Sequence, residues 1–233
     1  MGVSLLKCAI DGEMGLDVSV TDPDATVADL LAAMQQPADD PTVFKPFHKQ
    51  RYAICAGCVN NCCRSNRITP DLVSALALAA SLGLSLQQFA RAYLNCAADL
   101  PYPEFRRRPC PFLRNDRCSV YRDRALICRL YLCTPMSDRL EQLRGAVLLA
   151  GETALQQRLL ELGIGPHQWQ PARQRQSLRQ RYQRGELSQE RYRREQEQLE
   201  TLLEHNPFRE GKGYGSVRLV DCCPDWLWMA LRG

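Results

Sequence analysis

Histidine and lysine are scarce in this chain of 233 residues. The sequence contains three histidines, His48, His167 and His205, and only four lysines, so that 26 of the 30 basic residues are arginine. Catalytic zinc sites usually combine histidine or carboxylate ligands with an open position, and this composition argues against a site of that kind. We expect the three histidines to be solvated or to have structural roles.

The sequence also lacks a long apolar segment and a secretory signal. No stretch approaches the ~18 continuous apolar residues that would span a bilayer. Residues 1–10 are interrupted by Lys7 and have no cleavage site. We therefore expect a cytoplasmic protein without a membrane partner. In that reducing compartment, clustered cysteines are more often metal ligands or redox groups than structural disulfides.

Cysteine, by contrast, is abundant, with 12 residues of which eight fall into two sets. Crowded thiols bind metal, pair as disulfides or carry out redox chemistry, and the expected compartment favours metal. We predict that a shared metal centre draws on both sets. The candidate ligands are Cys55, Cys58, Cys62 and Cys63 in the first set and Cys110, Cys118, Cys128 and Cys133 in the second.

The spacing within the first set suits a metal–thiolate site. Cys55 and Cys58 are three positions apart, a spacing at which one turn of chain directs two sulfurs at one ion. Cys62 and Cys63 are adjacent, so we expect one to ligate while the other faces a second metal or the core. Closed zinc sites and 4Fe–4S clusters each need four sulfurs. Eight cysteines therefore supply two sites, or one site with spares.

The expected cofactor is an iron–sulfur cluster or a structural zinc ion. A four-thiolate centre of either kind carries a net charge of about −2. Arg64 and Arg129 directly follow cysteines and Arg117 precedes one, so their guanidinium groups are placed to offset this charge or to donate hydrogen bonds to sulfur. We expect core positions or spare thiols for the remaining cysteines, Cys8, Cys96, Cys222 and Cys223.

The pattern of apolar residues predicts a mainly α fold with a small β element (α+β), in which a helical body surrounds the Cys-rich loop region. Alternation over residues 3–10 and 16–21 indicates an N-terminal β-hairpin, and residues 214–220 form a candidate strand that would pair with it. The expected helices cover residues 26–36, 70–81, 85–98 and 138–162, followed by a solvated helical hairpin over 168–205 that Gly185 divides. Thr69 is expected to cap the helix that begins at Pro70, Ser85 the next helix, and Ser188 the second helix of the hairpin. The expected apolar face of the first helix consists of Val27, Leu30, Leu31 and Met34.

These elements suggest three parts. Residues 1–46 form a small hairpin-plus-helix module that ends in a proline-rich linker over 37–46. Residues 47–137 form the Cys-cluster metal-binding domain, and residues 138–233 form a helical C-terminal region with the terminal strand. The N-terminal part resembles the opening of a β-grasp module, although a small hairpin packed beside the helical body is the simpler interpretation.

Two cysteine motifs carry a family resemblance. The run C-x2-C-x3-C-C at Cys55–Cys63 and the run C-P-F-L-x4-C-x-V-Y-x2-R-x4-C-R at Cys110–Arg129 resemble the signatures of the YkgJ-like cysteine-cluster proteins. The resemblance covers about residues 52–135, including the helical spacer between the motifs. It implies a zinc- or iron-chelating domain, usually bacterial, with no settled reaction.

The resemblance also assigns individual residues. Ala125 stands where the family often has proline, and Leu130 and Tyr131 stand where it often has an aromatic–proline pair, so Cys133 is an extra. A related cluster occurs in bacterial flagellin lysine N-methylases, where an iron–sulfur centre is implied. The cysteines on motif positions are Cys55, Cys58, Cys62, Cys63, Cys110, Cys118 and Cys128.

Our first hypothesis is a metal-binding protein that is structural, transfers electrons or serves an unknown partner enzyme. The second is an enzyme that modifies protein side chains, as the methylase resemblance implies. The sequence has no Gly-rich nucleotide loop after a strand and no clear acid/base pair, which argues against this second hypothesis. Whether the chain is an enzyme is left open.

Two other functions are weaker expectations. A zinc-ribbon-like module would bind nucleic acid through basic and aromatic side chains, but the net charge is only +4. Redox chemistry at Cys55 and Cys58 lacks the strand-to-helix context of a dithiol motif. The residues of the basic patch are Arg106, Arg107, Arg108, Arg114, Arg117, Arg122 and Arg124, beside Phe105, Phe112 and Tyr121.

Overall fold

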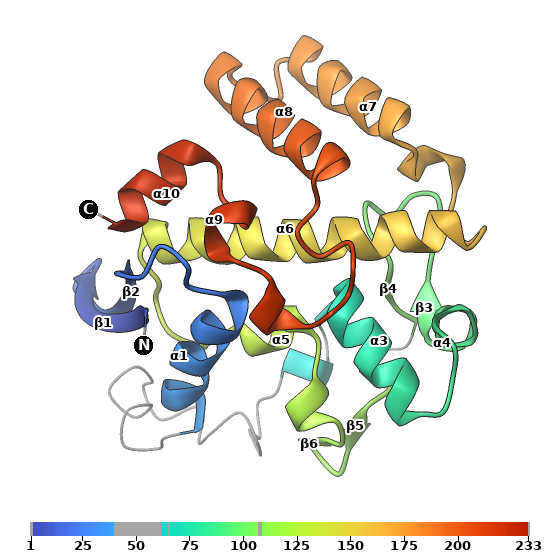
Figure 1. The fold of residues 1–233 in the computed structure, drawn as a ribbon, viewed down its shortest axis with the longest axis horizontal. Helices are drawn as coiled ribbons and strands as arrows, with labels where there is room; N and C mark the ends of the chain where they lie inside the picture. Colours follow the sequence, from blue (N-terminus) through green and yellow to red (C-terminus); the bar gives the residue numbers. More distant parts are fainter. Residues whose placement is uncertain (1, 40–61, 65, 107–108, 233) are drawn as a thin grey trace.

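Helix α6 (Asp138–Glu161) is the central element of the fold and crosses the molecule in Figure 1. The computed structural model describes residues 2–39, 62–64, 66–106 and 109–232 of the chain. Ser137 begins α6, because its side chain accepts a 3.2 Å hydrogen bond from the Leu140 amide. Gly163, with a positive φ of 68°, follows its end. The predicted helix over 138–162 is confirmed.

Helix α6 also carries the centre of the hydrophobic core. Its buried apolar side chains include Leu140, Leu143, Val147, Leu155 and Leu159. One continuous hydrophobic cluster joins them to buried residues of the N-terminal hairpin, of three helices that precede α6 in the sequence (α1, α3 and α4) and of the C-terminal segment. Since each fully buried aliphatic side chain stabilises the fold by ~1.5–3 kcal/mol, the segments on both sides of the cysteine sets are stabilised by one core.

The predicted N-terminal hairpin consists of strands β1 (Val3–Ile10) and β2 (Glu13–Val20), which pair antiparallel. The Asp11–Gly12 turn has positive φ values of 48° and 78°, as two-residue hairpin turns require. The buried face belongs to β2, where Leu16 and Val18 are in the core. Leu16 also exchanges two backbone hydrogen bonds, of 2.9 and 2.8 Å, with the segment that precedes α6, so the hairpin is joined to the body.

Helix α1 (Val27–Asp39) follows the hairpin and buries the predicted face. Thr26 and Asp29 cap its start reciprocally: the Thr26 amide donates to the Asp29 carboxylate at 2.8 Å, and the Asp29 amide donates to the Thr26 hydroxyl at 3.3 Å. The buried residues of the predicted face are Val27, Leu30, Leu31 and Met34.

The predicted linker over residues 37–46 is wrong at its start. Pro37 lies inside α1, and both Pro37 and Ala38 are buried. Proline removes one backbone hydrogen bond from a helix, and the burial of these two residues offsets that loss in the last turn. Residues 40–46 lie outside the described residues.

Helices α3 (Leu72–Ser81) and α4 (Leu86–Tyr93) lie between the two cysteine sets. Asp71, rather than the predicted Thr69, caps α3, because its carboxylate accepts the Ser74 amide at 3.0 Å. Ser85 caps α4 as predicted. Helix α4 ends at Tyr93 rather than near residue 98, because the next residues form β3 (Leu94–Asn95), which pairs with β4 (Glu104–Phe105).

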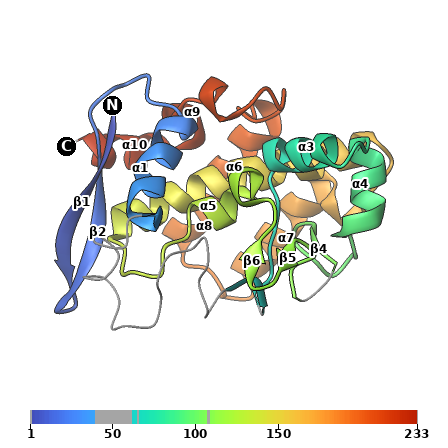
Figure 2. The same cartoon turned by 90° about the horizontal axis from the view of Figure 1, so that it is seen from below.

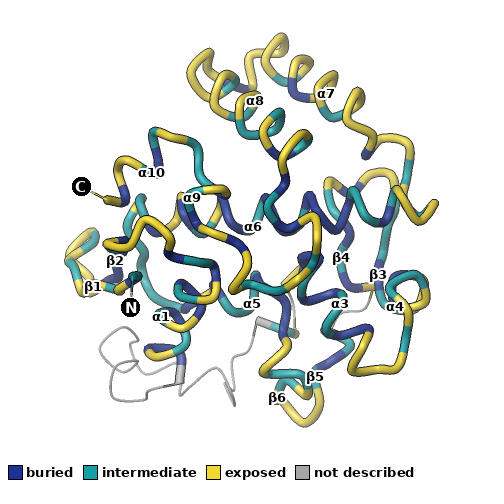
Figure 3. The backbone as a smooth tube through the Cα atoms, in the orientation of Figure 1, coloured by how far each residue is buried: buried dark blue, intermediate teal, exposed yellow. Residues whose placement is uncertain are grey.

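The predicted solvated helical hairpin is confirmed by α7 (Pro171–Gln183) and α8 (Gln189–Glu204). It lies on the opposite side of α6 from α3 and α1 (Figure 1), and most of its residues are exposed (Figure 3). Gly185 makes the connection with a φ of 74°, and Ser188 caps α8 by accepting the Arg191 amide at 3.2 Å.

The predicted strand over residues 214–220 is not formed. Tyr214–Ser216 is a 3-10 helix, η5, and Leu219–Cys222 is a short helix, α9, which precedes α10 (Asp225–Arg232). Leu219 and Cys222 are both buried, and their spacing of three suits one side of a helical turn better than one face of a strand. A single antiparallel bridge, between Thr26 and Arg218, joins this segment to the start of α1 rather than to the hairpin.

The segment of the second cysteine set contains four short elements: β5 (Leu113–Arg114), β6 (Arg117–Cys118), the 3-10 helix η3 (Tyr121–Asp123) and α5 (Leu126–Arg129). Cys118 lies on β6 and Cys128 on α5, whereas Cys110 precedes β5 and Cys133 follows α5. Figure 2 shows α5 against α6, with β5 and β6 further from that helix. These elements complete a mainly α fold with small antiparallel strand pairs, as predicted.

No single helix in the described ranges is long and apolar enough to cross a membrane. Within the same ranges, α3 and α4 together have the length and the apolar composition of a membrane span, but the two helices are bent by 94° at the break between them.

Candidate metal centre

The structure describes the side chains of five of the eight predicted ligands. Cys55 and Cys58 lie outside the described residues, and Cys62 is described only in its backbone, at the start of the 3-10 helix η2 (Cys62–Arg64). The five described side chains are all partly buried, a position in which the rest of the fold can shield a metal–thiolate centre. They are Cys63, Cys110, Cys118, Cys128 and Cys133.

A backbone hydrogen bond joins the two cysteine sets. The Cys110 amide donates to the Cys63 carbonyl with an N···O distance of 2.7 Å. Nearby, the Arg64 side chain forms an ion pair with Asp116. Both groups of that pair are exposed, so it adds little stability, but it connects the same two segments. The end of the first set therefore lies against the start of the second.

Cys110 and Cys118 lie on one tight loop. The Leu113 amide donates to the Cys110 carbonyl at 3.0 Å, and Leu113 pairs with Cys118 in the β5–β6 ladder. Asn115 and Asp116 turn the chain with positive φ values of 48° and 60°, which these two residue types tolerate better than most. The turn returns Cys118 to the neighbourhood of Cys110.

Cys128 lies in α5, and a buried carboxylate fixes the start of that helix. Asp71 is 1% exposed, and its Oδ2 accepts the Leu126 amide at 3.0 Å. The same carboxylate caps α3 and accepts the Tyr214 hydroxyl at 3.1 Å. Hydrogen bonds to charged groups contribute ~1.5–3 kcal/mol each. Asp71 thus holds α3, α5 and the C-terminal segment together beside Cys128.

Tyr214 and Arg129 complete this buried network. Burial, followed by the negative charge of Asp71, raises the pKa of Tyr214 well above its ordinary range, so its hydroxyl remains a neutral donor. The Arg129 guanidinium lies 5.3 Å from the centroid of the Tyr214 ring, and burial lowers its pKa. Arginine remains charged even so. The sequence prediction placed Arg129 beside the cysteines, but its contact with Tyr214 could not be read from spacing.

Gly151 allows α6 to approach Asp71. A Cβ at this position would lie 2.8 Å from the Asp71 Cβ and 3.4 Å from the Leu126 Cδ2. We predict that Gly151→Ala lowers the free energy of unfolding by ~1–3 kcal/mol, although alanine usually stabilises a helix interior.

The matched control for this prediction is Gly145→Ala in the same helix. No atom lies within 4 Å of a Cβ at Gly145, so we expect ~0.5–1 kcal/mol of stabilisation there. Urea denaturation measures both variants. Stabilisation by both would contradict the close contact at Gly151.

Three of the four cysteines expected outside the metal centre lie in the hydrophobic core or against it, as predicted. Cys222 belongs to the core, and Cys96 and Cys223 pack against it. Burial raises the pKa of all three thiols, that of Cys223 to about 12, and a thiol held protonated is a poor metal ligand. Cys8 is partly buried on β1.

The described side chains alone do not complete a metal site. Within residues 2–39, 62–64, 66–106 and 109–232, no group of three or more His, Cys, Asp or Glu side chains could hold a metal ion. His167 and His205 are exposed, as expected, and His48 lies outside these ranges. The donor chemistry still fits zinc or iron, because thiolates are preferred ligands of both. A complete centre requires thiolates from the first set.

Two of the three aromatic rings of the basic patch are not available to nucleic acid. Phe105 and Phe112 are buried and meet edge to face with their centroids 5.4 Å apart. The Tyr121 ring is covered by the Arg124 guanidinium, whose Cζ lies 3.9 Å from the ring centroid. Stacking on bases needs exposed aromatic faces, which the two buried phenylalanines do not offer.

Glu152 is a partly buried carboxyl group that sequence reasoning missed. It accepts a hydrogen bond from the Thr69 hydroxyl, and burial, with the nearby charge of Asp71, raises its pKa from 4.5 to about 7. A raised carboxyl pKa means that the folded protein binds this proton more tightly than the unfolded chain. The resulting stability is fully present below about pH 4.5 and is lost as the pH rises through about 7.

We therefore predict that the free energy of unfolding falls between about pH 5 and about pH 8, by up to ~3 kcal/mol more in the wild type than in Glu152→Gln. Glutamine keeps the acceptor for Thr69 and does not titrate. Urea denaturation across the pH range measures both proteins, and the exposed histidines cancel in the comparison. Parallel profiles would show that Glu152 has an ordinary pKa.

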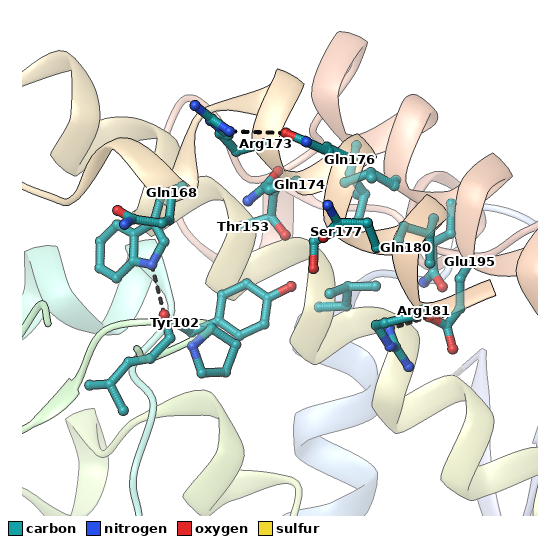
Figure 4. A pocket seen from close by; sticks show the side chains of 18 of the residues that line it. Tyr102, Thr153, Gln168, Arg173, Gln174, Gln176, Ser177, Gln180, Arg181 and Glu195 are labelled. Atoms are coloured by element: carbon teal, nitrogen blue, oxygen red, sulfur yellow. Dashed lines mark hydrogen bonds and ion pairs between the residues drawn. The ribbon is translucent and has the colours of Figure 1, made fainter. Parts of the chain in front are cut away.

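A groove of about 900 Å³ separates the α7–α8 hairpin from α6 (Figure 4). Tyr102 and Thr153 line it from the body, and Ser177 and Glu195 line it from the hairpin. Glu195 pairs with Arg181 at 2.9 Å, and burial raises the pKa of Tyr102 to about 12. The volume lies near the upper end of the ~300–1,000 Å³ range of small-molecule sites. None of the described residues that line this groove is a cysteine.

Comparison with known proteins gives one match. Residues 54–146 match the family model CxxCxxCC, described as "putative zinc- or iron-chelating domain". The matched range includes all eight candidate cysteines and helices α3 and α4 between the sets. Neither the curated proteins nor the solved structures provide a match to the chain.

Proposed function

We propose that residues 54–146 of this chain, which match the family model CxxCxxCC of the YkgJ-like zinc- or iron-chelating proteins, hold an iron–sulfur cluster or a structural zinc ion between the two cysteine sets. The observation that carries this proposal is the 2.7 Å hydrogen bond from the Cys110 amide to the Cys63 carbonyl. It holds Cys63, the last cysteine of the first set, against Cys110, the first cysteine of the second set.

The ligands of this centre are to be found among the eight candidate cysteines. Cys110 and Cys118 share one loop, and Cys128 lies in the short helix α5 that follows. The first set supplies the remaining thiolates, with three residues, Val59 to Asn61, between its second and third cysteines where the family name gives two. When bound, zinc would cross-link these segments, whereas an iron–sulfur cluster would also exchange electrons.

We assign the domain a structural or electron-transfer role in support of a partner protein. The described part of the cysteine region contains no histidine, and closed four-thiolate sites leave no position open for a substrate. The hairpin β1–β2 and the solvated hairpin α7–α8 lie outside the matched range. If this protein binds a partner that proteins of the matched family do not bind, we expect these two hairpins to make the contacts.

Anaerobic purification of the full chain tests this proposal. Iron, acid-labile sulfide and zinc are quantified per chain, together with the visible absorption spectrum. Either equal amounts of iron and sulfide in a coloured protein, or stoichiometric zinc in a colourless one, would support the proposal and decide the metal. A folded protein with neither metal would refute it.

A second candidate function is a protein-modifying enzyme related to the flagellin lysine N-methylases. The observation that favours it is the 900 Å³ groove between α6 and the α7–α8 hairpin, which has the size of a small-molecule site. Isothermal titration with S-adenosylmethionine tests this candidate. Saturable binding that is lost when Tyr102 is replaced by alanine would support it, and a flat titration would remove it.

A further inference from the structure

Arg124 is a buried cation within the cysteine region. It is 7% exposed and lies between η3 and α5, four positions before Cys128. Removing a guanidinium group from water costs free energy unless hydrogen bonds and an opposite charge compensate for the loss.

All three nitrogens of the Arg124 guanidinium donate to neutral oxygens. Nε donates to the Cys128 carbonyl at 3.3 Å, and Nη1 donates to the Tyr121 carbonyl at 2.6 Å. Nη2 donates to the Gln35 side-chain oxygen, on α1, at 3.0 Å. These contacts satisfy the hydrogen bonds of the guanidinium and fix its orientation, but none of them supplies a negative charge.

A second guanidinium increases the positive charge at the same place. Arg129 directly follows Cys128, and it lies within electrostatic reach of Arg124 as well as of the carboxylates of Asp71 and Asp123. Two partly desolvated cations beside one predicted ligand repel each other. A bound four-thiolate centre, with a net charge of about −2, would relieve that repulsion.

We propose that Arg124 is a positioning residue of the metal centre. Its guanidinium compensates the negative charge of the bound thiolate centre and holds the Cys128 backbone through the Cys128 carbonyl. Arg124 can have this role only if the proposed function is right, because its counter-charge is the metal–thiolate centre itself. A positive charge near the cysteines favours their thiolate form, and residues that support metal ligands typically change metal affinity ~10–100-fold when replaced.

The test is a competition titration of the full chain with Zn²⁺ against a chromophoric chelator. Thiolate sites accept zinc whether or not they hold iron in the cell. Arg124→Met is expected to lower zinc affinity ~10–100-fold. The matched control is Arg122→Met, which removes the same charge from an exposed residue of η3 and is expected to keep the wild-type affinity.

A second variant, Gln35→Glu, separates electrostatics from packing. It keeps the side-chain acceptor for Arg124 Nη2 and turns that contact into an ion pair. The long 3.4 Å hydrogen bond from Gln35 Nε2 to the Tyr121 hydroxyl is lost, but the carboxylate can accept from the same hydroxyl. If Arg124 only tied α1 to the cysteine region, a stronger contact would leave zinc affinity unchanged or raise it. If Arg124 instead compensates the charge of the centre, the introduced carboxylate would neutralise Arg124, and zinc affinity would fall ~10-fold.

The outcomes distinguish this inference from the proposed function. A wild-type protein that binds no zinc and carries no iron would refute the proposed function and this role together. A metal-binding wild type with unchanged zinc affinity in both Arg124→Met and Gln35→Glu would refute the role of Arg124 alone. Lower affinity in both variants, with Arg122→Met unchanged, would establish it.

Discussion

Replacing Cys118 by serine is expected to remove bound metal and to lower the free energy of unfolding at the same time. Cys118 lies on the β5–β6 loop beside Cys110, at the junction of the two sets. Metal that binds only the folded protein contributes its binding free energy to folding, ~10–16 kcal/mol for structural zinc in small peptides. Loss of one thiolate should therefore destabilise the fold by several kcal/mol, and Cys58→Ser should do the same.

Metal analysis and urea denaturation of the same samples measure this effect. The matched control is Cys8→Ser, since Cys8 lies on the N-terminal hairpin outside both sets. We expect the control to retain wild-type metal content and stability. Wild-type metal and stability in both Cys118→Ser and Cys58→Ser would contradict the proposal that these thiols bind metal.

Replacing Asp71 by asparagine should give the second large effect. Asparagine would turn an amide N–H₂ group toward donors that now share the two carboxylate oxygens: the Ser74 amide, the Leu126 amide and the Tyr214 hydroxyl. A buried donor that faces another donor loses its hydrogen bond and its solvation. We expect a loss of ~3–5 kcal/mol in the free energy of unfolding, and less bound metal because α5 positions Cys128.

The control for Asp71→Asn is Ser85→Ala, which removes the cap of the neighbouring helix α4. Ser85 is exposed and caps only its own helix, so its loss should destabilise the fold by ~1 kcal/mol without a change in metal content. Urea denaturation and metal analysis again provide the two readouts. Equal effects of the two substitutions would show that Asp71 is an ordinary helix cap and does not connect α3 with α5.

The sequence predicted best where the structural signal is local. Ser85 and Ser188 cap helices where their positions indicated, because capping depends only on residues three or four apart. The predicted apolar face of α1 was also correct. The matched family range includes both cysteine motifs.

The errors arose where distant partners outweigh local preference. Pro37 is normally a helix terminator, yet burial keeps it in α1. Residues 214–220 alternate as a strand would, but no sheet edge receives them, and Leu219 and Cys222 are buried from a short helix instead.

The candidate site was only partly accessible from sequence. Cysteine spacing gave the candidate thiols, because metal ligation requires particular residue types at particular intervals. The residues that support them could not be recognised this way. Asp71 accepts the amide of Leu126, and Arg124 donates to Gln35 on α1. Such contacts join residues far apart in the sequence and depend on the tertiary fold.

X-ray absorption spectroscopy of the purified wild-type protein, at the zinc or iron edge, tests the central claim most directly. We predict a first shell of sulfur atoms only, at about 2.3 Å, with Cys118→Ser losing the metal or one of these sulfurs. A first shell of nitrogen and oxygen atoms, or a sulfur shell that Cys118→Ser leaves intact, would contradict a thiolate centre shared by the two cysteine sets.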